Sequence, residues 1–330
     1  MTELERVGLG GNDKLSILRF SSEEDWLVLR QKGIGGSDAG AIMGLNKYTS
    51  PLAVYKAKVD GTAPDLSDNP NVRRGKELED FVLTKYVQPR LDRFGYTTEK
   101  PDFMILNSDY PFLRANLDGI ACLKSDPRVG TSILIEIKCV SMFAEDAWNG
   151  PDYGGIPPYY YAQIQHYLTV TGMNKAYLVA LFDRTWTVKW YPIKRDQKFI
   201  NEMLPILKHF YDYHMCMRMP PKITYSIDKE DAAEAISTAP KPHIPNQMMT
   251  LIVEKYRDVS ANLKSLEKEK DELVSTILDM YLQGYMPTEG TVKFTTVKSK
   301  KFNVTKFKEA NPGLYEQYCE DVETSRTTIK

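Results

Sequence analysis

The sequence has little cysteine and histidine, and neither residue type is arranged as a set of metal ligands. Four cysteines and four histidines are scattered over 330 residues, and no two cysteines have CxxC spacing. This scatter argues against a zinc site, an iron–sulfur cluster and a disulfide framework. A catalytic metal would then be held by carboxylate and backbone oxygens, which favours Mg²⁺, with Mn²⁺ as a substitute.

Long apolar runs are also missing. No stretch approaches the roughly 20 residues that are needed to span a bilayer. The first residues, MTELERVGLGGNDK, lack the apolar segment of a signal peptide. We therefore expect a cytoplasmic protein that has no membrane partner.

An excess of charge of one sign is absent from the whole chain but not from its parts. The formal net charge is −1, which argues mildly against a protein that coats nucleic acid without specificity. However, residues 291–308 contain six lysines and no acid, whereas residues 309–323 contain five acids and neither lysine nor arginine. A local basic surface is therefore still possible.

The pattern of apolar residues changes along the chain and predicts three parts. Residues 1–219 combine short apolar, strand-like runs with helical periodicity, which predicts an α/β core with a central mixed sheet flanked by helices. Residues 220–246 are rich in proline and acids and predict a linker. Residues 247–330 predict a helical C-terminal appendage: a long helix, a lysine-rich hairpin over 291–304 and a short helix over 305–321.

The long helix of the appendage carries a heptad pattern. Residues 247–283 contain neither glycine nor proline, and apolar residues recur in steps of four and three. The seam positions are Ile252, Tyr256, Val259, Leu263, Leu266, Lys270, Leu273, Ile277 and Met280. One helix cannot bury this seam by itself, so we expect a partner helix or another subunit. The alternative is a helical appendage that packs on the core.

The central chemical feature is Asp118, followed after seventeen residues by Glu136-Ile137-Lys138. In the segment ILIEIKCV, side chains alternate between two faces, so Glu136 and Lys138 share one face and the opposite face is wholly apolar. Charged groups in the middle of an internal strand are costly unless they are paired or bind a metal.

These residue types suit the cleavage of a phosphodiester. Two carboxylates can hold a divalent metal that polarises phosphoryl oxygens and activates a water molecule. A lysine beside them can orient or deprotonate that water and offset charge that develops on phosphorus. The alternative is a salt bridge on an exposed face, because E-x-K on a strand is common.

Three further features point in the same direction. Glu79 interrupts an apolar stripe on the helix expected over 72–88. Gln163 lies one helical turn from tyrosines and His166, on a face that could line a pocket. Arg30 and the glycine-rich turn before Ser37 offer a guanidinium, backbone amides and a hydroxyl, which suit phosphate. Taken singly, these features also have ordinary structural explanations: a boundary acid, the edge of an aromatic core and a simple turn.

Five segments together resemble the YqaJ-like viral recombinase family, which is related to phage lambda exonuclease within the PD-(D/E)XK nuclease superfamily. In chain order they are GIGGSDAGAIMG, RRGKELEDFV, LRANLDGIA, IEIKCV and YYAQIQHYL. One departure is that Leu117, rather than proline, precedes Asp118. This departure is a usual variation of the motif.

The resemblance implies a restriction-endonuclease-like core and a set of site residues. The implied catalytic residues are Asp118, Glu136, Lys138, Glu79 and Gln163. The implied metal ligands are Asp118, Glu136 and the backbone carbonyl of Ile137, with Glu79 as a possible addition in a one- or two-metal site. Arg30 and Ser37 resemble a pair that binds the 5′-phosphate of DNA.

The resemblance also implies an activity and partners. The activity would be Mg²⁺-dependent digestion of linear duplex DNA from its ends, in the 5′→3′ direction, which yields single strands for phage-type recombination by annealing. The partners would be duplex DNA ends, a single-strand annealing protein and further copies of the chain, a trimer by analogy, in the host cytoplasm if a phage encodes it. Three alternatives stay open: a structure-specific endonuclease, a DNA-binding scaffold without catalysis, and a helical adaptor.

Overall fold

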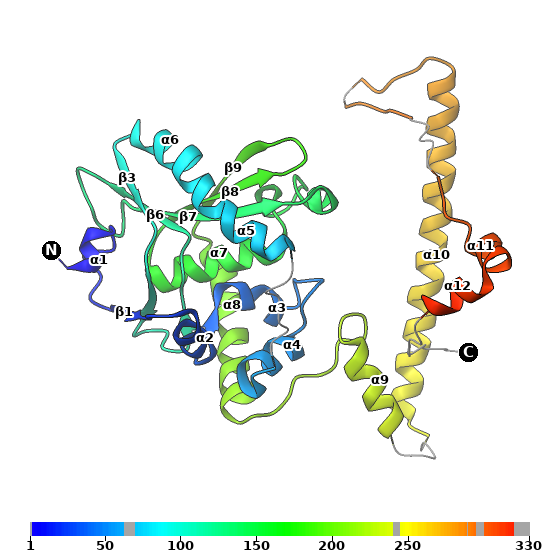
Figure 1. Cartoon of the computed structure of the whole chain (residues 1–330), viewed down its shortest axis with the longest axis horizontal. Helices are drawn as coiled ribbons and strands as arrows, with labels where there is room; N and C mark the ends of the chain where they lie inside the picture. Colours follow the sequence, from blue (N-terminus) through cyan, green and yellow to red (C-terminus); the bar gives the residue numbers. More distant parts are fainter. Residues whose placement is uncertain (1, 63–69, 240–244, 289, 295–299, 320–330) are drawn as a thin grey trace. The chain divides into compact units, whose positions relative to one another are not determined.

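The computed structural model describes residues 2–62, 70–239, 245–288, 290–294 and 300–319 (Figure 1). The chain divides into two compact units, residues 1–232 and residues 233–330. The first unit contains the sheet and the predicted site residues, and the second contains the long helix.

The first unit is built around a five-stranded sheet with the strand order β3-β6-β7-β8-β9. The strands are β3 (Tyr96–Glu99), β6 (Gly119–Leu123), β7 (Ile133–Val140), β8 (Lys175–Phe182) and β9 (Thr187–Lys194). β7 and β8 are parallel, and the other neighbouring pairs are antiparallel. The predicted fold class, an α/β core with a mixed sheet flanked by helices, is confirmed.

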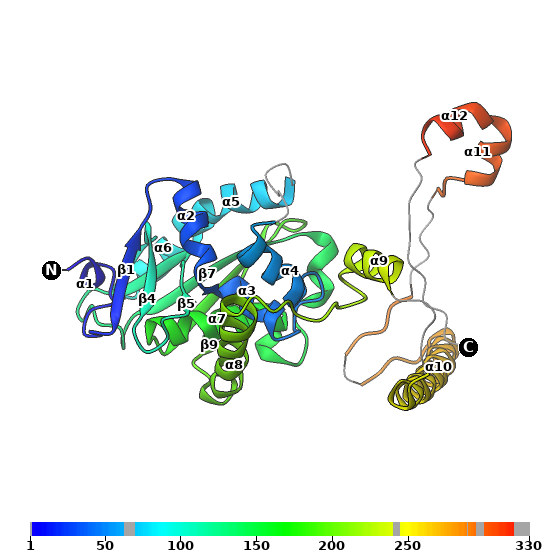
Figure 2. The ribbon, with the colours of Figure 1, turned by 90° about the horizontal axis from the view of Figure 1, so that it is seen from below.

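Helices cover both faces of this sheet (Figure 2). One face packs against α5 (Pro70–Val82), which continues through a π-helical turn, η2 (Leu83–Val87), into α6 (Gln88–Asp92). The other face packs against α7 (Pro158–Thr171), the helix that connects β7 to β8. Ile135 of β7 lies in the α5–α6 core and Leu134 in the α7 core, so the predicted alternation along this strand is confirmed.

Two small sheets and a glycine-rich helix extend the α7 side. β1 (Leu15–Arg19) pairs with β4 (Phe103–Asn107), and β2 (Ile34–Gly35) pairs with β5 (Leu113–Arg114). α3 (Gly36–Ile42) packs closely on α7. A Cβ atom at Gly36 would lie 2.4 Å from the Tyr167 ring, and one at Gly40 would lie 2.6 Å from Cβ of Tyr159. Glycine at both positions therefore lets the turn before Ser37 approach α7.

The remaining helices of the first unit are short, apart from α2 and α8. They are α1 (Glu3–Arg6), α2 (Glu23–Gln31), α4 (Pro51–Tyr55), η1 (Lys56–Asp60), η3 (Met142–Ala147), η4 (Tyr153–Gly155), α8 (Gln197–His209) and η5 (Phe210–Cys216). The Ser22 hydroxyl accepts a hydrogen bond from the Asp25 amide and caps α2.

The segment expected to be a linker, residues 220–246, is partly helical. It contains α9 (Lys229–Thr238), and the buried Asp228 carboxylate before this helix accepts hydrogen bonds from the Ser50 hydroxyl and the Thr224 amide. Two of its four acids, Glu230 and Asp231, lie in the first turn of α9, where they interact favourably with the helix dipole. Residues 240–244 lie outside the described residues.

The second unit contains the predicted long helix as α10 (Gln247–Leu282), which is capped by Asn246. The short helix expected over 305–321 is two helices, α11 (Val304–Ala310) and α12 (Pro312–Gln317), because Pro312 cannot continue α11 and begins a new helix instead. Residues 291–294 and 300–303 of the expected hairpin contain no strand, and 295–299 lie outside the described residues. Among the helices described, none is both long and apolar enough to cross a membrane.

Candidate active site

Asp118 lies beside Glu136 because of how β6 pairs with β7. Gly119 is opposite Ile135, so the preceding residue, Asp118, comes opposite Glu136. The Asp118 Oδ2 atom accepts a hydrogen bond of 2.8 Å from the Ile137 amide. The pairing therefore gathers the Asp118 carboxylate, the Glu136 carboxylate and the Ile137 backbone at one place on the sheet.

Glu136 forms the buried centre of this group, with an exposed fraction of only 1%. Its Oε1 atom accepts hydrogen bonds of 2.6 Å from Lys138 Nζ and 2.6 Å from Gln163 Nε2. Gln163 also donates to the Tyr167 hydroxyl at 3.3 Å. Within the described part of the chain, the buried Oε2 atom of Glu136 has no hydrogen-bond partner.

Negative charge is crowded here. Burial, followed by the charge of Asp118, raises the pKa of Glu136 to about 8. The same two causes raise the pKa of Glu79, on α5, to about 7. Burial opposes the charged form of Lys138, but Glu136 and Asp118 hold the pKa of this ammonium well above its ordinary value. One lysine is therefore shared by several carboxylates.

An aromatic wall supports Lys138 from α7. The Lys138 ammonium lies 5.2 Å from the centre of the Tyr160 ring, which is within cation–π range. Tyr160 in turn contacts the buried Trp148, with ring centres 5.7 Å apart. The sequence pattern predicted this polar–aromatic face of the helix but no role for Tyr160.

The carboxylates fit a divalent cation in charge and donor type. No group of three potential ligands among His, Cys, Asp and Glu is gathered in the described residues. Two such carboxylates do lie together, those of Asp118 and Glu136. The Glu136 Oε2 atom has no hydrogen-bond partner in the part of the chain that the structure describes, so it is available to a cation. Glu79 lies further out, 30% exposed and 4.0 Å from Lys100 Nζ. Hard oxygen donors with excess negative charge suit Mg²⁺ or Mn²⁺.

The predicted phosphate-binding pair is also brought together. Arg30 of α2 donates a hydrogen bond of 2.7 Å to the Ser37 hydroxyl at the start of α3. The Arg30 guanidinium lies 5.1 Å from the centre of the Trp26 ring, and 3.8 Å separates it from the Asp38 carboxylate. These contacts hold Arg30 beside the glycine-rich turn.

A buried ion pair that the sequence analysis did not identify lies behind Arg30. Lys58 Nζ is 2.6 Å from Asp38 Oδ2 and also donates to the Arg30 carbonyl at 2.9 Å, with only 4% of its side chain exposed. Asp38 accepts a further hydrogen bond of 2.8 Å from the Gly35 amide. Burial opposes ionisation of Asp38, but Lys58 and Arg30 keep the pKa of its carboxyl below the ordinary value. Asp38 therefore anchors both Arg30 and the turn.

One cavity of about 180 Å³ joins the two groups of residues. Its lining runs from Arg30, Ser37 and Arg114 at one end to Asp118, Glu136, Lys138 and Gln163 at the other. Arg114 donates hydrogen bonds to the Pro111 and Leu113 carbonyls, and burial lowers the pKa of its guanidinium. Of the predicted site side chains, only Glu79 does not line this cavity.

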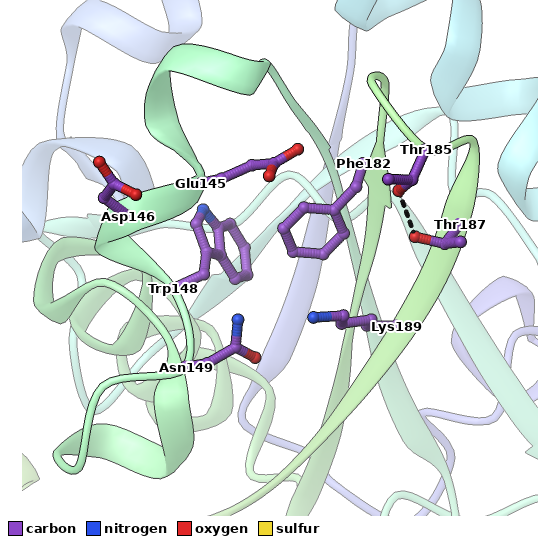
Figure 3. Close-up of a pocket in the computed structure, with 8 residues that line it drawn as sticks. All are labelled: Glu145, Asp146, Trp148, Asn149, Phe182, Thr185, Thr187 and Lys189. Atoms are coloured by element: carbon purple, nitrogen blue, oxygen red, sulfur yellow. Dashed lines mark hydrogen bonds between the residues drawn. The ribbon is translucent and has the colours of Figure 1, made fainter. Parts of the chain in front are cut away.

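A second cavity, of about 530 Å³, is lined in part by Trp148 (Figure 3). Trp148 and Phe182 form apolar walls, and Lys189 lies over the Phe182 ring at 4.8 Å. The Thr185 and Thr187 hydroxyls share a hydrogen bond of 2.7 Å at its edge. None of the predicted site residues lines this cavity.

His166 has a structural position on α7. Its Nε2 atom lies 3.0 Å from the Ile34 carbonyl, and the residue is fully buried. Burial lowers the pKa of its imidazole to about 4, so the ring is neutral at physiological pH. It connects α7 to β2, the strand that leads into the glycine-rich turn.

Comparison with known proteins confirms the family resemblance. Residues 25–174 match the family model described as YqaJ-like viral recombinase domain. YqaJ of Bacillus subtilis (strain 168) is 26% identical over 323 residues, which cover 94% of each chain. An alkaline exonuclease (LHK-Exo) from Laribacter hongkongensis is 22% identical with a TM-score of 0.44, over 58% of this chain and 91% of that one. A phage related exonuclease from Haemophilus somnus 129PT is 13% identical with a TM-score of 0.42, over 58% and 97%.

Proposed function

We propose that the protein is a divalent-metal-dependent nuclease that digests linear duplex DNA from its ends. The observation that carries this proposal is the single cavity with a carboxylate–lysine group at one end and a guanidinium–hydroxyl pair at the other. A DNA strand end offers the two matching features, a phosphodiester to cleave and a terminal phosphate to bind.

At the acidic end, Asp118, Glu136 and the Ile137 carbonyl would hold the metal, with Glu79 as a further candidate. When bound there, Mg²⁺ supplies a water of lowered pKa and polarises the phosphoryl oxygens. Lys138, which is held in the ammonium form by Glu136, offsets negative charge on the reacting phosphate. Gln163 orients the Glu136 carboxylate through Oε1, which leaves Oε2 free for the metal.

At the cationic end, Arg30 and Ser37 would bind the terminal 5′-phosphate. The support is a surplus of positive charge. Arg30 and Lys58 both pair with the Asp38 carboxylate, and the charge of Arg114 also acts on Lys58. Binding of the 5′-phosphate beside the metal implies digestion in the 5′→3′ direction.

The wider setting is proposed from the family alone. The single strands would pass to an annealing protein for phage-type recombination, in the host cytoplasm if a phage encodes the chain. Several copies of the chain, a trimer by analogy, would assemble on DNA.

The test is digestion of linear and closed circular duplex DNA with and without Mg²⁺. We expect loss of the linear DNA only with Mg²⁺, an intact circle, and no digestion by Lys138→Met. Lys124→Met is the matched control, because Lys124 is exposed and pairs with Asp92 instead of a residue of the site. Cleavage of the circle would instead indicate an endonuclease, and no digestion with either Mg²⁺ or Mn²⁺ would indicate a DNA-binding scaffold.

A further inference from the structure

The seam of α10 leaves large apolar side chains open to solvent. Eight of its nine residues are apolar, and each is between 42% and 61% exposed: Ile252, Tyr256, Val259, Leu263, Leu266, Leu273, Ile277 and Met280. They form one stripe along a helix of 36 residues, roughly 54 Å long at 1.5 Å per residue. A continuous exposed apolar stripe of this length marks an interaction surface.

The spacing of the stripe specifies what fits on it. Steps of four and three average 3.5 residues, the repeat that keeps two supercoiled helices in contact, whereas a straight helix repeats every 3.6. In heptad terms, Ile252, Val259, Leu266, Leu273 and Met280 occupy d positions. Tyr256, Leu263, Lys270 and Ile277 occupy a positions. The surface therefore fits another helix of the same repeat.

The one charged residue of the seam indicates a second copy of this chain. Lys270 occupies an a position, while Glu267 and Glu269 occupy the flanking e and g positions. In a parallel, in-register pair, an a residue packs next to the preceding g residue of the other helix. Lys270 of each copy then lies beside Glu269 of the other copy. A single lysine at an a position also fixes the register of such a pair.

We propose that α10 forms a parallel, in-register coiled coil with α10 of another copy, so that the chain self-associates through its C-terminal unit. This inference does not depend on the nuclease activity. It assigns a role to the heptad seam, which the YqaJ-like domain at residues 25–174 does not include.

The first test is the mass of the full-length protein in solution by light scattering. We expect an oligomer for the wild type and a monomer for the double variant Leu263→Glu and Leu266→Glu. Ala261→Glu with Ser265→Glu is the matched control, because it adds the same charge on the solvent side of α10 and should keep the oligomer. A monomeric wild type, or a seam variant of unchanged mass, would overturn the proposal.

The second test uses a variant that should strengthen the association, because a misfolded protein would not produce that result. Lys270→Leu removes the charged layer, and the association should tighten at least tenfold in a dilution series. An unchanged or weaker association would contradict the role of Lys270.

The third test measures orientation. Cysteine in place of Ile252, in a background with the two exposed cysteines changed (Cys216→Ser and Cys319→Ser), should give a disulfide-linked dimer on mild oxidation. The background without the new cysteine should give none. In an antiparallel pair the two new cysteines would lie tens of ångströms apart, so the absence of a cross-link in an associated protein would refute the parallel arrangement.

Discussion

The two ends of the central cavity have opposite charge surpluses. At the sheet end, Asp118 and Glu136 share Lys138, and among the described residues the Glu136 Oε2 atom has no hydrogen-bond partner. At the other end, Arg30 and Lys58 pair with one carboxylate, that of Asp38, and Arg114 adds a third positive charge that acts on Lys58. One end therefore suits a cation and the other an anion.

Burial makes this difference in charge energetically costly. Unequal charges on an exposed surface cost little, because water and salt screen them. For a buried group such as Glu136 the uncompensated charge is destabilising, as its raised pKa indicates. Residues with such costs are expected where a ligand offsets them, which is why we assign a metal to one end and a phosphate to the other.

The largest change is expected from Gln163→Leu at the acidic end. This substitution removes a hydrogen bond to the buried Glu136 carboxylate, and the rate of digestion should fall by about 10- to 100-fold. Gln165→Leu is the matched control, because that glutamine is buried on the same helix but binds the Lys194 carbonyl and the Asp196 amide instead. If both variants lose the same activity at equal folded fraction, Gln163 has no special role.

A smaller change is expected at the cationic end from Asp38→Asn. Arg30 and the turn lose their anchor, so the KM for 5′-phosphorylated ends should rise about tenfold while kcat changes less. The variant also leaves Lys58 buried without its partner, which costs about 3–5 kcal/mol of stability.

The double variant Asp38→Asn with Lys58→Met separates these two effects. It should recover most of the stability, because it leaves no buried unpaired charge, but it should keep the raised KM. Recovery of both properties would show that Asp38 acts on stability alone.

The buried Glu136 carboxyl at the acidic end should also make the free energy of unfolding depend on pH and on the metal. The folded-state pKa of Glu136 lies above its ordinary value, so the metal-free protein loses stability as pH rises from about 4.5 to about 8. Glu136→Gln should therefore raise the melting temperature in EDTA at pH 8 by several degrees and abolish the further rise on adding Mg²⁺. A lower melting temperature than wild type in EDTA would refute the charge crowding.

The last effect concerns stability rather than digestion and is expected from His166, which does not line the cavity. Its folded-state pKa is about 4, so the unfolded chain binds a proton between pH 6.5 and pH 4 that the folded chain does not. The free energy of unfolding should therefore decrease by up to about 3 kcal/mol as pH falls from 6.5 to 4. The decrease should be smaller in His166→Gln. Urea denaturation at pH 7 and pH 4.5 measures this decrease. An equal decrease in the wild type and in His166→Gln would contradict the low pKa of His166.

Local patterns predicted part of this arrangement and missed the rest for a physical reason. The alternation of β7 and the turn spacing of α7 are periodic, so these patterns alone predicted the faces on which Glu136, Lys138 and Gln163 lie. Lys58 lies in a π-helical turn and meets Asp38 only through tertiary packing. Its local sequence, KAKVD, predicts only a solvated charged segment. Arg114 was missed for the same reason.

The role of the cationic end is tested by comparing the digestion of linear duplexes with 5′-phosphoryl and with 5′-hydroxyl ends in Mg²⁺. We expect the wild type to digest the phosphorylated duplex at least tenfold faster than the hydroxyl duplex, and Arg30→Met to bring this ratio of rates close to one. Arg128→Met, which removes an exposed arginine paired with Asp126, should leave the ratio unchanged. Equal digestion of both duplexes by the wild type, or an unchanged ratio in Arg30→Met, would contradict the assignment of the cationic end to the terminal phosphate.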